Sequence, residues 1–118
     1  MSFSNSTPLL LALSLGIPIA SMMPNHHKAA DRAFDRAMTS MQSEMQRVKM
    51  TGNPDPDFAA MMIPHHQGAI EMAKVELQYG TDPRLRRLAQ EIIVTQQSEI
   101  ELMQLTLKHP RSAGHSPK

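Results

Sequence analysis

The stretch DPDFAAMMIPHHQGAIEMAKVELQYGTDPRLRR, residues 55–87, contains one complete helix and the start of the next. The dipeptide Asp-Pro occurs at Asp55 and again at Asp82. An aspartate side chain accepts hydrogen bonds from the free N–H groups of a first helical turn, and proline suits the first helical position. Gly80 is typical of a helix end. The pattern therefore predicts one helix over 55–79 and another over 82–108.

Upstream of this stretch, residues 29–50 also follow a helical pattern. Apolar side chains recur there at spacings of three and four, as along one helix face: Phe34, Met38, Met41, Met45 and Val48. The residues around Gly52 then interrupt the helix. Three helices of similar length with short connections predict an all-α protein, an antiparallel up-down-up helical bundle. No strand pattern occurs.

The first 20 residues carry no charged side chain and include the apolar run LLLALSLGIPIA, residues 9–20. A run of this length is too short to span a bilayer and has the size of a signal-peptide core, although no Lys or Arg precedes it. We expect a periplasmic or otherwise extracytoplasmic protein without stable membrane insertion after processing. The alternative is an N-terminal helix that stays and packs. The expected divisions are a signal segment 1–20, a Met/His-rich linker 21–29, the helical bundle domain 30–108 and a flexible tail 109–118.

Composition excludes several classes of function. A net charge of +1 and 3% aromatic residues give no indication of nucleic-acid binding. The chain has no cysteine, which excludes a disulfide framework, a thiolate zinc site and a cysteine nucleophile. Its 11 methionines, against three Phe, one Tyr and no Trp, are the unusual feature. Methionine either fills an irregular core or supplies thioether ligands.

Two methionines stand four residues before two histidines, in the order Met61, Met62, His65, His66. Residues four apart lie on the same helix face, so each methionine can meet one histidine. Thioether and imidazole together suit copper, and thioether in particular suits Cu(I). The alternative is a Met-rich core with two histidines at its edge. Pro64 lies inside this helix, and we expect one ring to face a neighbouring helix and the other its rim, so that the rings could serve two ions.

The antiparallel connections predict which residues lie at the same level. Met45 should lie near Met62, and Met41 near the two histidines, at a rise of about 1.5 Å per residue. On the third helix, Gln96, Gln97 and Glu99 should reach that level, with Met103 one turn further. Glu99 could accept a hydrogen bond from the far nitrogen of a liganding histidine, which would fix the tautomer of the ring.

A near-copy of the motif, MMPNHH, occupies residues 22–27. Its His26 and His27 could form a flexible accessory metal clip, or the repetition could be chance in a Met-rich chain. Pro24 argues against a regular helix in this segment. Met72 lies seven residues beyond His65, and we interpret it as a core residue or as part of a second site.

The segments FAAMMIPHHQGAIEM, residues 58–72, and LAQEIIVTQQSEIELM, residues 88–103, together resemble the domain-of-unknown-function family three-hundred-and-five. This family of small, usually exported, helical bacterial proteins is classed as ferritin-like and includes CopM-like periplasmic copper-binding proteins. The resemblance covers roughly residues 31–107. It implies a helical bundle, export, and copper binding through Met61, Met62, His65, His66 and Met72.

Two hypotheses follow from the sequence. The first is a protein that buffers or carries copper, exchanges it with a donor or acceptor protein, and catalyses nothing. The second is a structural or interaction module whose core, poor in aromatic side chains, is completed by homodimerisation. A ferritin-like di-iron enzyme is disfavoured, because it needs inward-facing Glu-x-x-His pairs and this sequence has none.

Overall fold

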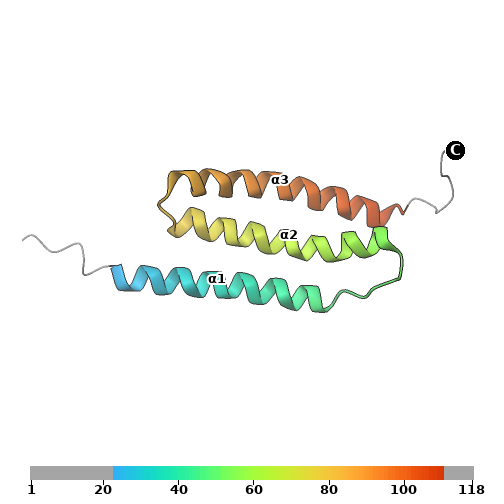
Figure 1. Ribbon diagram of the computed structural model, residues 1–118, viewed down its shortest axis with the longest axis horizontal. Coiled ribbons are helices and arrows are strands. Elements are labelled where there is room, and N and C mark those ends of the chain that lie inside the picture. Colours follow the sequence, from blue (N-terminus) through green and yellow to red (C-terminus); the bar gives the residue numbers. More distant parts are fainter. Residues whose placement is uncertain (1–22, 111–118) are drawn as a thin grey trace, which may run out of the picture.

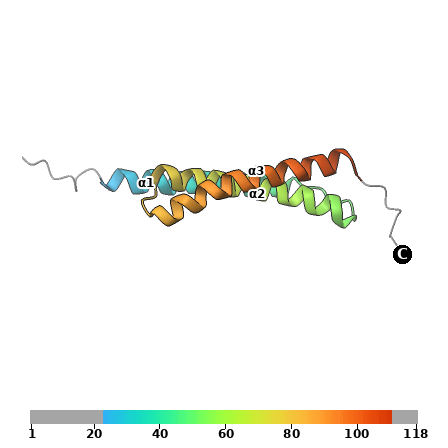
Figure 2. The ribbon, with the colours of Figure 1, turned by 90° about the horizontal axis from the view of Figure 1, so that it is seen from above.

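The computed structural model describes residues 23–110, and this part of the chain forms three antiparallel helices. These are α1 (Met23–Gln46), α2 (Pro54–Tyr79) and α3 (Pro83–Lys108) (Figure 1). The predicted all-α, up-down-up arrangement is confirmed. Helix α2 lies between α1 and α3 and packs against both, whereas no Cα pair within 8 Å joins described residues of α1 and α3. The three helices therefore form one layer, which twists along its length (Figures 1 and 2).

The first helix differs from the prediction at both ends. It begins at Met23, so the expected linker over 21–29 is wrong from that residue on, and the helical domain starts before residue 30. Pro24 is compatible with this start, because the first turn of a helix needs no intrahelical N–H donor. The helix ends at Gln46 rather than near Met50. The predicted signal segment lies outside the described residues, as does the tail from residue 111.

The starts of the other two helices follow the expected chemistry. Helix α3 is capped as predicted, with the Asp82 side chain accepting a hydrogen bond from the N–H of Arg84 at 2.8 Å. In α2 the cap is Asn53 rather than Asp55, and Pro54 takes the first helical position. The Asn53 side chain accepts a hydrogen bond from the N–H of Asp55 at 3.3 Å. The α2 start therefore lies two residues earlier than the Asp-Pro pattern indicated.

Asp57 fixes the connection between α1 and α2. Its buried carboxylate accepts hydrogen bonds from the Thr51 N–H at 2.7 Å, the Thr51 hydroxyl at 2.8 Å and the Gly52 N–H at 3.0 Å. The bond from the Thr51 backbone contributes most to lowering the pKa of Asp57. Gly52 has a φ of +84°, a conformation that glycine adopts without steric cost. The connection is thereby tied to the first turn of α2.

The interior of the layer is narrow. No large side chain among the described residues is fully buried, and five of the eight buried apolar residues are alanines. The eight are Ala33, Ala37, Ala59, Ile70, Ala73, Val75, Ala89 and Ile100. Small side chains let neighbouring helices approach closely, but they bury little apolar area. Within residues 23–110, none of the helices combines the length and the apolar character needed to cross a membrane.

Candidate metal site between α2 and α3

His66 projects from the middle of α2 toward α3, where it meets Glu99. The His66 Nε2 lies 2.7 Å from a carboxylate oxygen of Glu99, and the imidazole side chain is only 13% exposed. An ionised carboxylate can only accept hydrogen bonds, so the hydrogen of this bond lies on Nε2. The contact predicted between Glu99 and a histidine of the motif is therefore present. It fixes both the direction of the ring and its tautomer.

The other ring nitrogen of His66 is the atom available for a ligand. The His66 Nδ1 is buried and has no hydrogen-bond partner among residues 23–110. With the hydrogen on Nε2, neutral imidazole carries a lone pair on Nδ1. Buried polar atoms in proteins are nearly always satisfied, so a buried lone pair without a partner calls for an explanation. A metal ion bound at Nδ1 would supply one.

A second buried polar atom without a partner lies in the same groove. It is the Gln96 Oε1, about one turn before Glu99 on α3. Apart from this atom and the His66 Nδ1, every buried side-chain nitrogen or oxygen in the described part has a hydrogen-bond partner. Gln96 precedes Glu99 by three residues, so the two lie on about the same side of α3.

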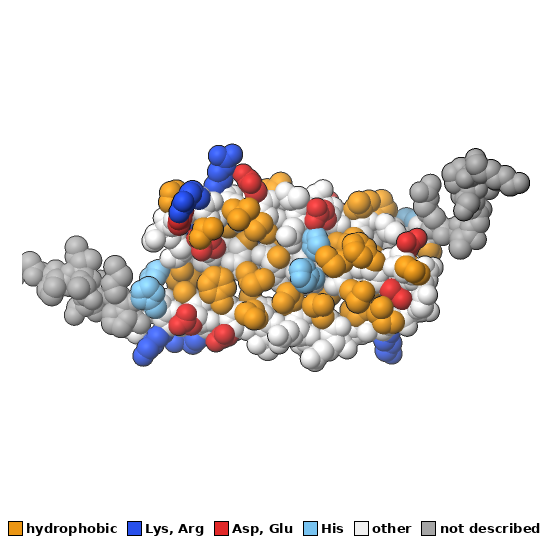
Figure 3. Space-filling view, viewed as in Figure 1, with side chains coloured by type: hydrophobic (Ala, Val, Ile, Leu, Met, Phe, Trp, Pro, Cys, Tyr) orange, Lys and Arg blue, Asp and Glu red, His pale blue; other side chains and the backbone are white. Residues whose placement is uncertain are grey.

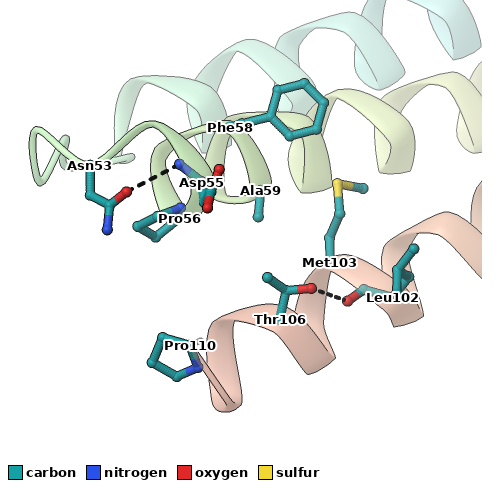
Figure 4. Close-up of a pocket in the computed structure, with 9 residues that line it drawn as sticks. All are labelled: Asn53, Asp55, Pro56, Phe58, Ala59, Leu102, Met103, Thr106 and Pro110. Atoms are coloured by element: carbon teal, nitrogen blue, oxygen red, sulfur yellow. Dashed lines mark hydrogen bonds between the residues drawn. The ribbon is translucent and has the colours of Figure 1, made fainter. Parts of the chain in front are cut away.

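Thioethers flank His66 on both helices. Met62 precedes His66 by one turn on α2, and Met103 follows Glu99 by one turn on α3. Because the helices are antiparallel and His66 touches Glu99, these two half-buried methionines lie at the same level. Figure 4 shows the Met103 side chain reaching from α3 toward α2 near Phe58 and Ala59, at a hollow of about 320 Å³. The groove thus holds one imidazole, with two thioethers about one turn further along it.

His65 faces a different way from His66. Its side chain is exposed, its ring centroid is 6.1 Å from that of His66, and the two planes are inclined by 59°. This is the predicted division, with one ring facing a neighbouring helix and the other its rim. The two histidines therefore do not converge as a pair.

Methionines of α1 approach α2 beside His65. The Met41 sulfur packs against Gly68, which follows His65 by three residues, and Met41 also borders a hollow with Pro64. The level predicted for Met41 is therefore correct to within one turn. Met45 lies one turn beyond Met41 on α1 and is 36% exposed, and Met61 precedes His65 by one turn on α2. Spacing therefore places these methionines within about one or two turns of His65 along the helices.

The remaining candidates lie elsewhere. Met72 lines an apolar hollow with Phe34, Leu85 and Leu88, which favours its interpretation as a packing residue. The His26 ring packs edge-on against Tyr79, with 5.1 Å between ring centroids. Tyr79 is about 20 Å along α2 from His66, so the exposed His26 and His27 do not join the main motif. Met22 of the near-copy lies outside the described residues.

Carboxylates and imidazoles alone do not form a metal site here. No group of three or more His, Asp or Glu residues within 23–110 is arranged to hold a metal ion. Hard ions such as Mg²⁺ and Ca²⁺ need several oxygen ligands and fit these residues poorly. A donor set of sulfur and imidazole fits a soft ion instead.

Two residues that position the site were not predicted. Gly68 provides the flat surface on which Met41 packs, and Asp57 holds the preceding connection. The glycine directly after the His-His-Gln triplet could have been interpreted as a close helix contact, since glycine is disfavoured inside helices unless backbone proximity requires it. The role of Asp57 depends on where the connection folds back, which no local pattern shows.

These features define a small all-α protein with a Met/His groove between antiparallel helices. The chain belongs to the family described as Domain of unknown function (DUF305), whose profile matches residues 14–107. One similar protein is the Uncharacterized protein L153 of Acanthamoeba polyphaga mimivirus, 45% identical over 49 residues. The match covers 42% of this chain and 32% of the viral protein, so it spans about a third of that relative. Family membership supports the fold, and neither description names a ligand.

Proposed function

We propose that this protein binds Cu(I) in the groove between α2 and α3 and buffers or carries it without catalysing a reaction. The observation that carries the proposal is the His66 ring, which Glu99 holds by Nε2 while the buried Nδ1 is left without a partner. Met62 and Met103 add sulfurs at the neighbouring level. Imidazole with two thioethers is a soft donor set, typical of Cu(I) sites, and Ag(I) would be bound by the same chemistry.

A role outside the cytosol belongs to the same proposal. Thiols outside the cytosol tend to be oxidised to disulfides, whereas thioethers cannot form them. A chain with 11 methionines and no cysteine would therefore keep its soft ligands in an oxidising compartment. The uncharged first 20 residues support export. Copper would then pass between this protein and a donor or acceptor on the same side of the membrane.

The experiment is an anaerobic Cu(I) titration against a competing chelator. His66→Ala should weaken binding at least tenfold, because it removes the oriented nitrogen. Met62→Leu and Met103→Leu should each weaken it too, since leucine keeps the apolar volume but lacks the sulfur. His109→Ala and Met50→Leu are the matched controls, because both residues are exposed and lie outside the groove. If the His66 and His109 variants retain equal affinity, the proposed site is wrong.

A further inference from the structure

The three-helix layer leaves one broad face without a covering layer. Phe34, Met72, Leu85 and Leu88 come from all three helices and line one open hollow of about 270 Å³ on this face. Met38 continues it along α1, one turn beyond Phe34. Figure 3 shows hydrophobic side chains along the middle of the face, interrupted at its centre by His side chains, with Lys and Arg side chains at its borders and several Asp and Glu side chains between. We call this surface the apolar face.

Several large apolar side chains on this face are about half exposed to solvent. Leu85 and Leu88 are 52% and 49% exposed, and Met38 is 45% exposed. A second hollow between α1 and α2 is polar by comparison. Its lining includes Arg36, Ser40, Glu71 and Lys74. Stable domains bury the apolar side of a helical layer against a second layer. A single layer whose interior consists largely of alanine does not provide that burial.

The dimensions of the apolar face match a stable dimer interface. Helices of 24 to 26 residues are about 36 to 39 Å long, and three of them side by side span about 25 to 30 Å. This whole side of the layer, polar residues included, therefore measures about 1,000 Å² on each copy. Two copies face to face would bury about 2,000 Å² in total, within the range of stable homodimers.

The apolar run over residues 9–20 is too short to provide this cover. As a helix it would extend about 18 Å, and one helix is about 10 Å wide. It would cover about a fifth of the face. A second copy instead presents a surface of the same size and chemistry. Of the residues around the hollow only Glu76 is charged, so the hollows of two copies can meet with little charge repulsion.

We propose that the protein is a homodimer in which the apolar faces of two copies pack against each other. The interface is isologous, so each copy contributes the same side chains and the two-fold axis crosses the middle of the face. The layer then becomes one half of a two-layer, six-helix assembly. This inference is argued from the apolar residues, and because His side chains lie on the same face, the interface would also cover them.

The test is the mass in solution of the full chain, measured by sedimentation equilibrium without added metal. The parent protein should have twice the mass of one chain at micromolar concentrations. Leu88→Glu, on the apolar face, should shift it to a monomer. Val94→Glu is the matched control, because Val94 is on the same helix and 73% exposed but does not line the apolar hollow. A monomeric parent, or dimer loss in the control alone, overturns the proposal.

A second measurement covers the case in which the Leu88 variant does not fold. The chain has no cysteine, so Ala69→Cys, near the middle of the apolar face, gives a single attachment point. A short bismaleimide should cross-link this variant efficiently into a two-chain product, whereas Val94→Cys should cross-link poorly. Equal cross-linking at both positions would show that the apolar face is not the interface.

Discussion

At the scale of single residues, His66 depends on Glu99 for its orientation. An imidazole at the edge of a groove can rotate and can carry its hydrogen on either nitrogen. The bond of 2.7 Å between the Glu99 carboxylate and Nε2 removes both freedoms. Metal-bound histidines are commonly held by a carboxylate in this way, and loss of that partner typically lowers metal affinity by about 10- to 100-fold.

We therefore predict that Glu99→Ala weakens Cu(I) binding by about 10- to 100-fold without removing a metal ligand. Glu99→Gln should have a smaller effect, because its amide oxygen can still accept a hydrogen bond from Nε2. The chelator competition titration measures both. Glu101→Ala is the control, since Glu101 is exposed on the same helix and bonds to Gln97 rather than to a histidine. Equal affinities for the Glu99→Ala and Glu101→Ala variants would contradict this role of Glu99.

The lowered pKa of Asp57 makes the stability of the fold depend on pH. Its hydrogen bonds lower its pKa in the folded chain below the ordinary value of 3.8. The carboxylate therefore stabilises the fold above that value, and the contribution is lost as pH falls through the lower folded pKa. Asp57→Asn should lower the thermal unfolding midpoint at neutral pH. The midpoint of this variant should also fall less than that of the parent when the pH is lowered. Asp55→Asn, at an exposed position, should keep the acid dependence of the parent. An unchanged acid dependence in the Asp57 variant would contradict this assignment.

At the scale of helices, the contact between α1 and α2 depends on Gly68. A Cβ placed on Gly68 would lie 2.7 Å from the Met41 Cβ and 2.6 Å from the Met41 sulfur. The sulfur can rotate away, but the Cβ moves only if α1 moves. At a solvent-exposed position inside a helix, Gly→Ala stabilises the folded state by about 1 kcal/mol. Overpacking a close contact destabilises it by about 1 to 3 kcal/mol.

We predict that Gly68→Ala lowers the free energy of unfolding by about 1 to 2 kcal/mol, because overpacking outweighs the gain in helix propensity. Urea denaturation measures it. Gln67→Ala, at the exposed neighbouring position, should change stability by less than about 0.5 kcal/mol. A more stable Gly68→Ala variant would mean that the two helices are further apart than described.

The order and levels of the helices could be predicted from the sequence because their signals are local. Asp82 caps α3 as expected, and reflection about the two connections placed Met41 near His65 and Glu99 near His66. The start of α1 was missed because Pro24 was interpreted as a helix breaker, although a first turn tolerates proline. The α2 cap was misplaced because Asn53-Pro54 and Asp55-Pro56 offer equivalent starts.

The lateral arrangement of the helices and the exact site could not be predicted in the same way. An apolar stripe shows which face of a helix is buried, but not whether three stripes meet around one axis or lie side by side. The choice of His66 over His65 as the buried ring likewise depends on the rotation of α2 relative to α3. Buried residues on both helices, such as Ile70 on α2 and Ile100 on α3, pack to set that rotation, and no local sequence pattern pairs them.

At the scale of the whole molecule, the groove and the apolar face have separate roles. The groove residue His66 contacts Glu99 between α2 and α3, and Phe34, Leu85 and Leu88 line the open face of the layer, on which Figure 3 also shows His side chains. Metal binding stabilises the folded state over the unfolded one whether the protein is a monomer or a dimer. The mass of the metal-free protein tests the dimer and the Cu(I) titration tests the metal site, so each proposal has its own measurement.

The measurement that tests the copper proposal most directly is ¹⁵N NMR of the histidine rings, recorded before and after anaerobic addition of one equivalent of Cu(I). The apo protein should show His66 with its hydrogen on Nε2, and Cu(I) should shift the Nδ1 resonance of that ring far more than its Nε2. A His66 ring that carries its hydrogen on Nδ1, or whose resonances do not move when Cu(I) is added, would contradict the account.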